Sequence, residues 1–556
     1  MLMEAYKELE DVVGPENISH DPAILDGYAF QPVENRSPPW AFRPEFVVLP
    51  ANTEEVQKIV KLCNKYKIKF KALSAAGWGA WSAPGSEGVG MVDLRRMNRI
   101  LEIDERNMYA VIEPNVNWAQ LQAEIMKKGM NCNIIGAGSH ASPLVSCTSA
   151  WGMGWNSLYH GYNGRNVLGV EWVLPTGEIL RLGSLGTGAG WFCGDGPGPS
   201  LRGLMRGFVG ALGGLGIFTK CAIKLYNWPG PREPHREWKL DGILRDLKGE
   251  VPKNFKSYLL VLPNLEKYID VGYKIVNAEI GFSLIKNAIG LLLATMMPNI
   301  FRKLPEFPVI RERLKQFQHQ LQFILAANSE RELEYQYKVL KKIMKETRGL
   351  LLDLGESSSR NLFSFLEDFM KATGDSTLDE SEMAIQTDTI ASTLWGFVRV
   401  IYPPLAFRVG GGARFVLGGE DVWDHTVLQG KMTTEIKEEF IKKGLLLDDL
   451  ADNVWGLLYE SDSLIGHQEQ IILFNQRDPK QVEGANEFEK IAIEEALEQN
   501  IQIGNRITMD PGTNEIIGPR YCDYHLWQRK IKKFFDPNLC SDSSWYISVE
   551  TEEEDK

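Results

Sequence analysis

The stretch from Ile68 to Ser82 constrains the fold more than any other part of this 556-residue sequence. An apolar, β-prone run ends at Leu73 and leads into a loop of mostly small residues, Ser74-Ala-Ala-Gly-Trp-Gly-Ala-Trp-Ser82. Because small residues let the backbone approach a bound anion, successive N–H groups in such a loop can hold phosphate oxygens without a basic side chain. A small-residue loop after a strand is also a common turn, so the neighbouring sequence decides between the two interpretations.

The length and composition are those of a globular protein. The chain is too long for one ordinary core and 44% of its residues are apolar, which indicates two or three domains. The formal net charge is −12, whereas a general nucleic-acid binder needs a basic face for phosphate contacts. We therefore expect no nucleic-acid partner.

The cysteines and the first residues of the sequence indicate the cellular compartment in which the protein is expected. The seven cysteines are widely spaced and form no CxxC pair, which argues against zinc or iron–sulfur binding and fits reduced thiols. Residues 1–10 are acidic and amphipathic and lack the basic region and apolar core of a signal peptide. We expect a cytoplasmic protein.

Hydrophobic periodicity predicts many short strands and a few helices in the N-terminal part. The expected helices there are 53–66 and 118–128, and the expected strands are 46–50, 90–94, 97–104, 109–114, 167–174, 178–182 and 217–225. A Pro-rich segment, 228–234, marks the first domain boundary. Beyond it, helices (311–326, 330–347) alternate with strands (258–262, 395–402, 470–474), and a last helix spans 526–535. The pattern predicts an α+β fold.

Two glycine motifs fail the requirements of a Rossmann dinucleotide site. The segment 136–141 formally matches GxGxxA, but that fingerprint needs a following helix and an acidic residue about 20 positions on. Pro143 and a run of small polar residues follow instead, and the next acidic residue is Glu171. The pair Gly77 and Gly79 has Ser82 in the place of the third glycine. We therefore expect no nicotinamide-type Rossmann domain.

The order of motifs fits another flavin-binding architecture. A strand ends at Pro50, and after it come helix 53–66, loop 74–82, Met97–Ile100, Glu113-Pro114, loop 136–156, Gly169–Glu178, Gly213–Thr219 and, near the end, Phe535-Asp-Pro-Asn538. This order resembles the vanillyl-alcohol oxidase superfamily, whose FAD domain also occurs in para-cresol, D-lactate and glycolate dehydrogenases and in alkyl-dihydroxyacetone-phosphate synthase. The resemblance covers about residues 40–230; the last motif adds a weaker match, and 236–500 matches in general texture only.

The resemblance implies both a fold and a cofactor. The fold is a PCMH-type FAD-binding domain of two α+β subdomains in residues 1–235, an α+β cap domain with an antiparallel sheet in 236–499, and a segment, 500–556, that returns to the FAD domain. The cofactor is FAD, held by the two small-residue loops and the start of a later strand. The implied cofactor-binding residues are Pro50, Ser74, Ala75, Ala76, Gly77, Trp78, Gly79, Ala80, Gly138, Ser139, Ser146, Ser149, Gly152, Gly154, Asn156, Gly216 and Ile217.

Candidate catalytic residues come from the cap and the C-terminal segment. His467 and Glu469 fall on one side of an expected strand, where they can move a proton near flavin N5; the alternative is a histidine that is only hydrogen-bonded in the structure. Arg520 and Tyr521 can bind a phenolate or a carboxylate, and an exposed polar loop explains them equally well.

The other histidines bear on the form of the cofactor. His140 and His160 lie in the second loop, where either can touch the flavin. The first loop lacks the histidine that the family commonly uses for covalent attachment, so we expect non-covalent FAD. No two of the eight histidines are spaced by one residue, as in the metal-binding HxH of some relatives, and nothing else groups histidines with acidic residues at metal-ligand spacing, so no metal is expected.

The resemblance implies an FAD-dependent oxidoreductase. It would remove hydride from a small alcohol, a 2-hydroxy acid or an alkylphenol and pass the electrons to an acceptor protein, as a homo-oligomer or as a subunit of a redox complex. One alternative is a redox-neutral flavoenzyme of the alkyl-dihydroxyacetone-phosphate synthase type. The other is a non-catalytic FAD-binding subunit, which would fit Ala75 and Ala76 in place of the family's glycines and the absence of its PGK sequence after Asn538.

These expectations predict the visible spectrum of the purified protein. Bound oxidised flavin should absorb near roughly 370 and 450 nm, and acid precipitation should release the colour into the supernatant. Colour that stays with the pellet would indicate a covalent link. A protein without flavin, even after incubation with FAD, would contradict the enzyme interpretation.

Overall fold

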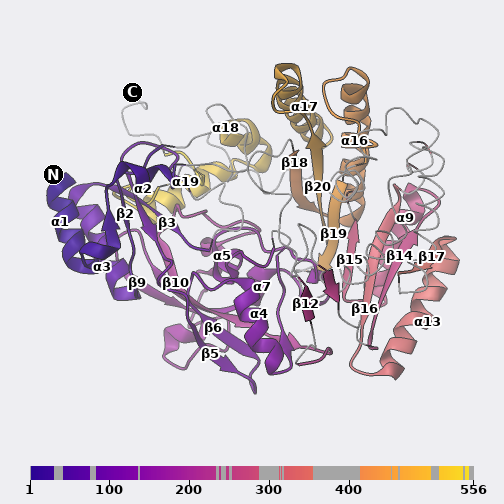
Figure 1. The fold of residues 1–556 in the computed structure, drawn as a ribbon, viewed down its shortest axis with the longest axis horizontal. Coiled ribbons are helices and arrows are strands. Elements are labelled where there is room, and N and C mark those ends of the chain that lie inside the picture. The colour runs from indigo at the N-terminus through magenta and orange to yellow at the C-terminus, as the bar shows by residue number, and fades with distance from the viewer. Residues whose placement is uncertain are drawn as a thin grey trace.

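The computed structural model describes residues 2–29, 42–75, 83–135, 138–232, 237–239, 246–248, 253–286, 288, 312, 315, 318–354, 413–452, 454–460, 464–501, 513–542 and 545–549. They form two regions that lie next to each other (Figure 1): an N-terminal region with two main sheets and a second region built on one large sheet. Helices and strands are mixed in both, which confirms the predicted α+β class. The domain limits 1–235, 236–499 and 500–556 remain a prediction.

The first sheet of the N-terminal region has a parallel core. Its order is β1 (Ile18–Ser19), β2 (Phe46–Val48), β4 (Val89–Asp93) and β3 (Lys69–Leu73), with β2 and β3 both parallel to β4. The helix α3 (Thr53–Tyr66), predicted from its periodicity, connects β2 to β3, because parallel strands need a crossover. It begins where the Asn52 side chain accepts a hydrogen bond from the N–H of Glu55 (2.9 Å). The helix α1 (Leu2–Val13) packs against it.

The second sheet is antiparallel throughout. Its order is β5 (Ile100–Asp104), β6 (Tyr109–Ile112), β10 (Ile217–Lys224), β8 (Val167–Val173) and β9 (Ile179–Leu182). All five were expected, although β5 begins three residues later than the sequence suggested. The apolar face of α4 (Trp118–Lys127) joins the same core. On β8, the buried Trp172 stacks between Phe218 and Phe535, with ring centroids 4.9 and 5.6 Å away.

The C-terminal part adds to the N-terminal sheets. The helix α19 (Tyr524–Phe535) supplies Phe535 to the core of the second sheet. After it, the chain runs beside β3 of the first sheet: the Phe70 N–H donates to the Cys540 carbonyl (2.7 Å) and the Asp542 N–H to the Phe70 carbonyl (2.8 Å). Segments more than 450 positions apart in the sequence are thereby joined by backbone hydrogen bonds.

A buried ion pair stabilises this junction. Lys532 Nζ lies 2.5 Å from Asp536 Oδ2, and both side chains are fully buried. The ammonium also donates to the carbonyls of Gly214 (2.8 Å) and Ser541 (2.7 Å). Asp536 accepts hydrogen bonds from the N–H groups of Cys540 and Ser541. The aspartate of the Asp-Pro-Asn motif therefore organises the turn that brings the chain back to the N-terminal region.

The second region is built on a seven-stranded antiparallel sheet. Its order is β17 (Leu350–Asp353), β14 (Phe255–Val261), β16 (Gln320–Ala326), β15 (Ser283–Lys286), β19 (Val454–Glu460), β20 (Leu464–Leu473) and β18 (Ala413–Asp421). In Figure 1 the helices α9 (Leu265–Asn277), α13 (Glu330–Thr347) and α16 (Trp423–Lys442) lie away from the N-terminal region, and α17 (Pro479–Glu498) stands above the sheet.

Strand alternation divides this sheet into a helix face and an inner face. On β16, Leu321, Phe323 and Leu325 pack into the core formed with the helices. Ile324, from the alternate set, packs into the core of the N-terminal region. The Ser283 hydroxyl on the neighbouring β15 donates to the Trp155 carbonyl. The inner face is therefore the one turned toward the N-terminal region.

One sequence expectation for this region is wrong. We expected a helix over 311–326, but residues 320–326 form β16, paired with β14 on one side and β15 on the other. Because both faces of the strand are buried, nearly every position is apolar or uncharged and periodicity cannot separate strand from helix. The expected helix 330–347 is confirmed as α13. The expected strand 395–402 lies outside the described residues.

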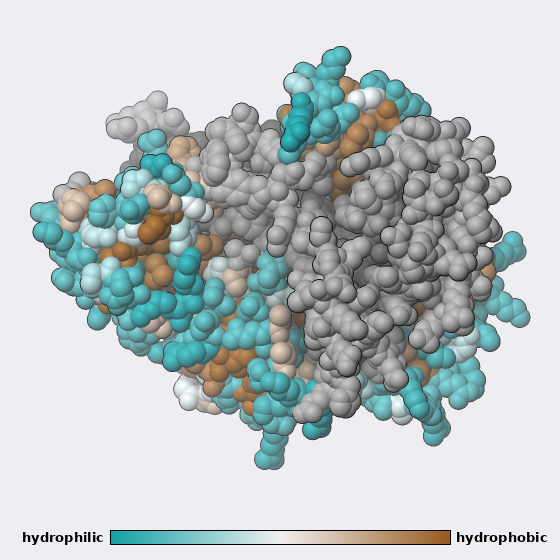
Figure 2. All heavy atoms as spheres, in the orientation of Figure 1, coloured by the Kyte–Doolittle hydropathy of each residue, from teal (hydrophilic) through white to brown (hydrophobic). Residues whose placement is uncertain are grey.

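The remaining elements are short. They are η1 (Pro15–Asn17), α2 (Pro22–Asp26), β7 (Met130–Asn131), α5 (Pro143–Thr148), α6 (Ser157–His160), α7 (Asn163–Asn166), η2 (Gly183–Thr187), α8 (Arg202–Met205), β11 (Tyr226–Asn227), β12 (Glu237–Lys239), β13 (Asp246–Lys248), α18 (Thr513–Ile517) and η6 (Gly518–Tyr521). The described surface visible in Figure 2 is mostly hydrophilic, with small apolar patches. Of the helices that could be described, none is at once long and apolar enough to cross a membrane.

The buried ion pair predicts a large loss of stability on substitution. Lys532→Met leaves Asp536 buried without its counter-ion, which costs about 3–5 kcal/mol of the free energy of unfolding. The matched control is Lys533→Met, since Lys533 is exposed on the same helix. Urea unfolding followed by circular dichroism measures both variants, and equal stability of the two would contradict the assigned role.

Candidate functional site

The two loops that the resemblance assigns to FAD meet in the structure. The Ser142 N–H donates to the Ala75 carbonyl (3.1 Å), which joins the start of the first loop to the second. The Ser142 hydroxyl donates to the Pro114 carbonyl (2.6 Å). Ser74 and Ala75 are half-buried at this junction. The other residues expected in the first loop lie outside the described residues and remain predictions: Ala76, Gly77, Trp78, Gly79 and Ala80.

Gly138 and Ser139 form a tight turn beside α4. Gly138 has a φ of 109°, a backbone conformation that favours glycine. Its N–H donates to the Ile135 carbonyl (3.0 Å), and its carbonyl accepts from the Ala141 N–H (3.3 Å). The Ser139 carbonyl accepts from the Ala119 N–H at the start of α4 (2.8 Å). The helix thus fixes the loop while the Ser139 side chain stays half-exposed.

Asn156 and Gly154 shape the second loop from inside. The buried Asn156 side chain accepts a hydrogen bond from the Ile134 N–H (3.2 Å) and donates to the Cys132 carbonyl (3.1 Å). A Cβ on Gly154 would lie 2.2 Å from the Ile134 carbonyl oxygen, so only glycine fits there. The side chain of Asn156 is therefore occupied by backbone groups of the loop itself.

The other three expected residues of this loop also make internal contacts. The Ser146 hydroxyl donates to the Pro143 carbonyl (3.0 Å), and the Ser149 hydroxyl lies 3.1 Å from that of Thr148. A Cβ on Gly152 would lie 3.0 Å from the Tyr162 ring. These residues hold the shape of the loop, and a direct contact with FAD remains a prediction for each.

Arg206 is a buried cation that sequence reasoning missed. Its guanidinium donates to the carbonyls of Ser146 (2.6 Å) and Ala150 (2.9 Å) and to the Tyr162 hydroxyl (3.1 Å). It thereby stabilises the carbonyl end of α5, where backbone acceptors lack helical partners. In the sequence Arg206 stands in a glycine-rich segment without a motif, so nothing there indicated the role.

Pro50, Gly216 and Ile217 lie where the two N-terminal sheets meet. Pro50 is buried after β2. Gly216 has a φ of 89°, and a Cβ there would lie 2.4 Å from the Val173 carbonyl oxygen. Its N–H donates to the Ser541 hydroxyl (2.8 Å), which connects it to the C-terminal segment. The Ile217 side chain is buried in the core beside the first sheet.

His467 and Glu469 form, together with Glu420, a three-residue acid–base cluster on the inner face of the large sheet. His467 Nε2 lies 3.2 Å from Glu469 Oε1, which confirms that the two share a face. His467 Nδ1 lies 3.3 Å from Glu420 Oε1 on β18. The side chains of His467 and Glu420 are 1% exposed and that of Glu469 is 14% exposed, so Glu469 is the member nearest to solvent.

The charges of this cluster set the protonation of His467. Burial alone would lower its pKa, but the hydrogen bonds and charges of Glu420 and Glu469 outweigh burial and raise the pKa to about 9. His467 is therefore an imidazolium at neutral pH. With both carboxylates ionised, the cluster carries one net negative charge. Glu420 was missed from the sequence because only strand register brings it opposite His467.

The cluster faces the loop that contains Trp155 and Tyr162. Ile465, on the same face of β20 as His467, packs into the core of the N-terminal region. The helix α6 contacts the neighbouring strand β19. Burial raises the pKa of the Tyr162 phenol, and the charge of Glu420 adds to that rise against the opposing charge of Arg206. Glu420 of the large sheet and Tyr162, which follows the second loop, therefore lie close enough to interact electrostatically.

Arg520 and Tyr521 lie at the far end of α17. Arg520 Nη1 donates to the Leu497 carbonyl (2.7 Å), and the residue is exposed. Tyr521 packs against Leu497 and Ile517. These contacts connect the 3₁₀ helix η6 to α17, and a catalytic role for the pair remains a prediction.

His160 and His140 occupy different surroundings. His160 is buried, with its ring centroid 4.4 Å from Tyr226 and 5.4 Å from Phe282. Burial, assisted by the charge of Lys224, lowers its pKa to about 3, so the imidazole is neutral. His140 is half-buried in the turn that follows Gly138. Contact of either with flavin remains a prediction.

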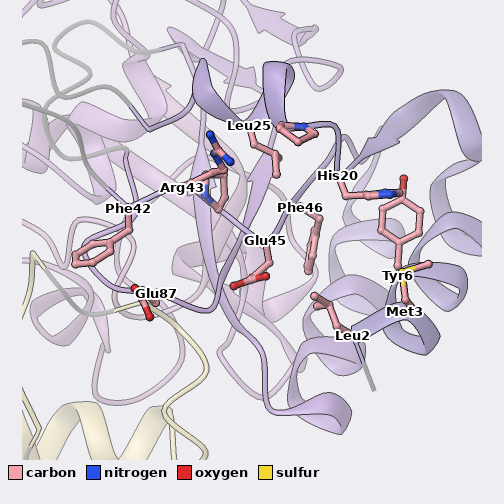
Figure 3. A pocket seen from close by; sticks show the side chains of 12 residues that line it. Leu2, Met3, Tyr6, His20, Leu25, Phe42, Arg43, Glu45, Phe46 and Glu87 are labelled. Atoms are coloured by element: carbon pink, nitrogen blue, oxygen red, sulfur yellow. The ribbon is translucent and has the colours of Figure 1, made fainter.

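A surface hollow near the N-terminus does not belong to this site. Figure 3 shows it between α1, α2 and the segment that precedes β2. Its lining includes Tyr6, His20, Arg43 and Glu45. Among the described residues, none that is expected in the cofactor or catalytic site lines it.

The raised pKa of His467 predicts how stability depends on pH. The ion pairs favour the protonated form in the folded state, so their contribution is complete below pH 6.5 and is lost as the pH rises through about 9. The wild type should therefore exceed His467→Gln in free energy of unfolding at pH 6, and the difference should shrink by pH 10. His425→Gln, on the exposed surface of α16, is the control and should show little difference at either pH. A His467→Gln difference that is constant with pH would contradict the assignment.

Comparison with known proteins supports a flavin site. Residues 44–183 match the family described as FAD binding domain. The flavoprotein subunit of 4-cresol dehydrogenase (hydroxylating) from Pseudomonas putida is 29% identical over 42% of this chain and 43% of its own length. A glycolate oxidase subunit of Bacillus subtilis is 28% identical over 41% and 45%, and D-lactate dehydrogenase of Anaerostipes hadrus is 30% identical over 42% and 45%. The chain matches about half the length of these relatives.

Solved structures match over nearly the whole chain. p-Cresol methylhydroxylase with bound substrate aligns with 98% of this chain and 97% of its own, with a TM-score of 0.67 and 17% identity. Alkyldihydroxyacetonephosphate synthase aligns with 97% of this chain and 84% of its own, with a TM-score of 0.59 and 13% identity. At these identities the likeness concerns the fold.

The residues present fit FAD. At the junction of the two loops the residues are small, and Ser74 and Ser139 are half-buried hydroxyl residues; main-chain groups and hydroxyls without bulk are the donor chemistry that suits a diphosphate. Gly216 leaves no room for a side chain where the sheets and the C-terminal segment meet. The expected cofactor, FAD, is confirmed. Residues 44–183 match an FAD-binding domain, and the chain shares the fold of p-cresol methylhydroxylase, which confirms the PCMH-type fold that the order of its motifs predicted.

Proposed function

We propose that this protein is an FAD-dependent oxidoreductase that oxidises a small alcohol, 2-hydroxy acid or alkylphenol and passes the electrons to an acceptor protein. Bound FAD would supply the oxidant, since its isoalloxazine takes up a hydride with its electron pair from the substrate carbon. The observation that carries the proposal is the position of the Glu420–His467–Glu469 cluster on the sheet face turned toward the FAD-binding domain.

Glu469 is the proposed proton acceptor. When hydride leaves a carbinol carbon, the C–H and O–H bonds break, a C=O bond forms and the hydroxyl proton needs a base. Departure of the hydride makes that hydroxyl strongly acidic, so a carboxylate suffices as the base. Glu469 is the most exposed member of the cluster, which leaves it accessible to a substrate hydroxyl.

His467 is the proposed positioning residue for Glu469. As an imidazolium it donates toward Glu420 on one side and toward Glu469 on the other, which holds the Glu469 carboxylate in one orientation. Because Glu420 and His467 are almost completely buried, the support is rigid. Such support for a reacting side chain keeps its geometry within the limits that catalysis needs.

The proposed function and its two alternatives differ in whether substrate reduces the flavin and whether the electrons are passed to an acceptor protein. One relative is the flavoprotein subunit of a larger dehydrogenase, which supports the proposal of an acceptor protein for this chain. A redox-neutral enzyme would bind FAD without passing electrons on. A non-catalytic subunit would bind FAD that no small substrate reduces.

The proposal predicts the effect of Glu469→Gln. The variant keeps the size of the side chain but removes the base, so anaerobic flavin reduction by an alcohol substrate should slow by about 10²–10⁴-fold. Flavin content should stay unchanged. Glu435→Gln, an exposed position on α16, is the matched control and should reduce flavin at the wild-type rate. Stopped-flow absorbance near 450 nm gives the rate, and a Glu469→Gln rate within twofold of wild type would exclude this role.

A further inference from the structure

Strand register places a row of residues across the inner face of the large sheet. Glu420 pairs directly with His467, His467 with position 457 of β19, that position with Ile285, and Ile285 with Gln322. Directly paired residues of antiparallel strands point to the same face. Glu420, His467, Ile285 and Gln322 therefore share the face turned toward the FAD-binding domain. From His467 to Gln322 the row crosses three strand spacings, about 14 Å.

The two ends of this row differ in charge. At one end Glu420, His467 and Glu469 carry one net negative charge when both carboxylates are ionised. In the middle Ile285 is fully buried in the core of the N-terminal region. At the other end Gln322 is uncharged and 3% exposed. The solvent-accessible part of this face therefore lies at the acidic end, at Glu469, whose side chain is 14% exposed.

Three buried cations in the described part of the surrounding elements are held by other partners. Lys286 alternates with Ile285, so it points to the helix face, where its ammonium lies 2.8 Å from Asp452. Lys437 of α16 lies 2.5 Å from Asp449 on the same side. Next to the second loop, Arg206 directs its guanidinium to backbone carbonyls and the Tyr162 hydroxyl. Over the described residues, these cations are not directed at a ligand on the inner face.

We propose that the substrate of this site is a neutral hydroxyl compound without a carboxylate or phosphate group, bound with its reacting hydroxyl at Glu469, the most exposed member of the cluster. An anionic group next to the cluster would meet like charge with little solvent to screen it, whereas a hydroxyl donates a hydrogen bond to the carboxylate. The inference rests on the proposed function and narrows it, since it removes 2-hydroxy acids and phosphorylated compounds from the candidate substrates.

A matched pair of ligands tests the inference on the FAD-loaded protein. 1-Phenylethanol and mandelate both have a secondary hydroxyl beside a phenyl ring. The carbon that bears the hydroxyl carries a methyl group in 1-phenylethanol and a carboxylate in mandelate. Perturbation of the flavin spectrum measures the Kd of each. We expect the wild type to bind 1-phenylethanol at least tenfold more tightly than mandelate. In Glu469→Gln the ratio of the two Kd values should be smaller, because mandelate should bind more tightly than it does to the wild type. Mandelate that binds as tightly as 1-phenylethanol to the wild type would overturn the inference.

A second measurement is independent of how well either compound fits. Iodide and acrylamide quench flavin fluorescence as an anionic and a neutral probe, and constant ionic strength keeps long-range screening equal. The iodide-to-acrylamide quenching ratio should be at least threefold lower than that of free FAD and should rise in Glu469→Gln, but not in Glu435→Gln. A ratio equal to that of free FAD, or no access by either probe, would contradict an acidic site open to the flavin.

The outcomes separate this inference from the proposed function. If no alcohol or hydroxy acid bleaches the flavin, the proposed oxidation fails, while the quenching ratio still reports the charge of the site. If mandelate bleaches the flavin as fast as 1-phenylethanol, the oxidation stands and the neutral-substrate inference falls. Selective bleaching by 1-phenylethanol supports both.

Discussion

The arrangement of the N-terminal region depends on the buried pair of Lys532 and Asp536. One ammonium contacts the Asp536 carboxylate and the carbonyls of Gly214 and Ser541, so it joins α19, the loop before β10 and the segment beside β3. Taking both charges out of water is costly, and the pair is favourable only because backbone groups satisfy the remaining donors and acceptors. That requirement fixes the geometry, and with it the position of Gly216 between the sheets and the C-terminal segment.

At the second loop, too, buried polar side chains are stabilised by hydrogen bonds to backbone groups. Here the side chains are a neutral amide, that of Asn156, and the guanidinium of Arg206. Asn156 hydrogen-bonds backbone groups of 132–134, and Arg206 binds the carbonyl end of α5. A loop so rich in glycine and serine would otherwise keep much conformational freedom. Side-chain hydrogen bonds from inside therefore give the loop its shape.

The fold was predictable where periodicity or motif order is strong. Helices 53–66 and 330–347 have clear apolar faces and capping residues, and both were found. The segment 320–326 was misread because a strand buried on both faces loses its alternation of polar and apolar residues. In the candidate site, His467 and Glu469 could be named because they are two positions apart on one strand. Glu420 could not, since it lies 47 positions away and becomes a neighbour only through strand pairing.

By itself, the sequence determined three properties: the α+β class, the FAD-binding domain, and an acidic chain whose cysteines are too widely spaced for a metal site. These properties follow from periodicity, from short motifs in a set order, and from composition. The tertiary structure decided which side chains meet: Arg206 with α5, Lys532 with Gly214, and Glu420 with His467. Those contacts join segments tens to hundreds of residues apart, and their partners are selected by sheet register and by the need to satisfy buried polar groups. Sheet register and the satisfaction of buried polar groups cannot be deduced from any local stretch of sequence.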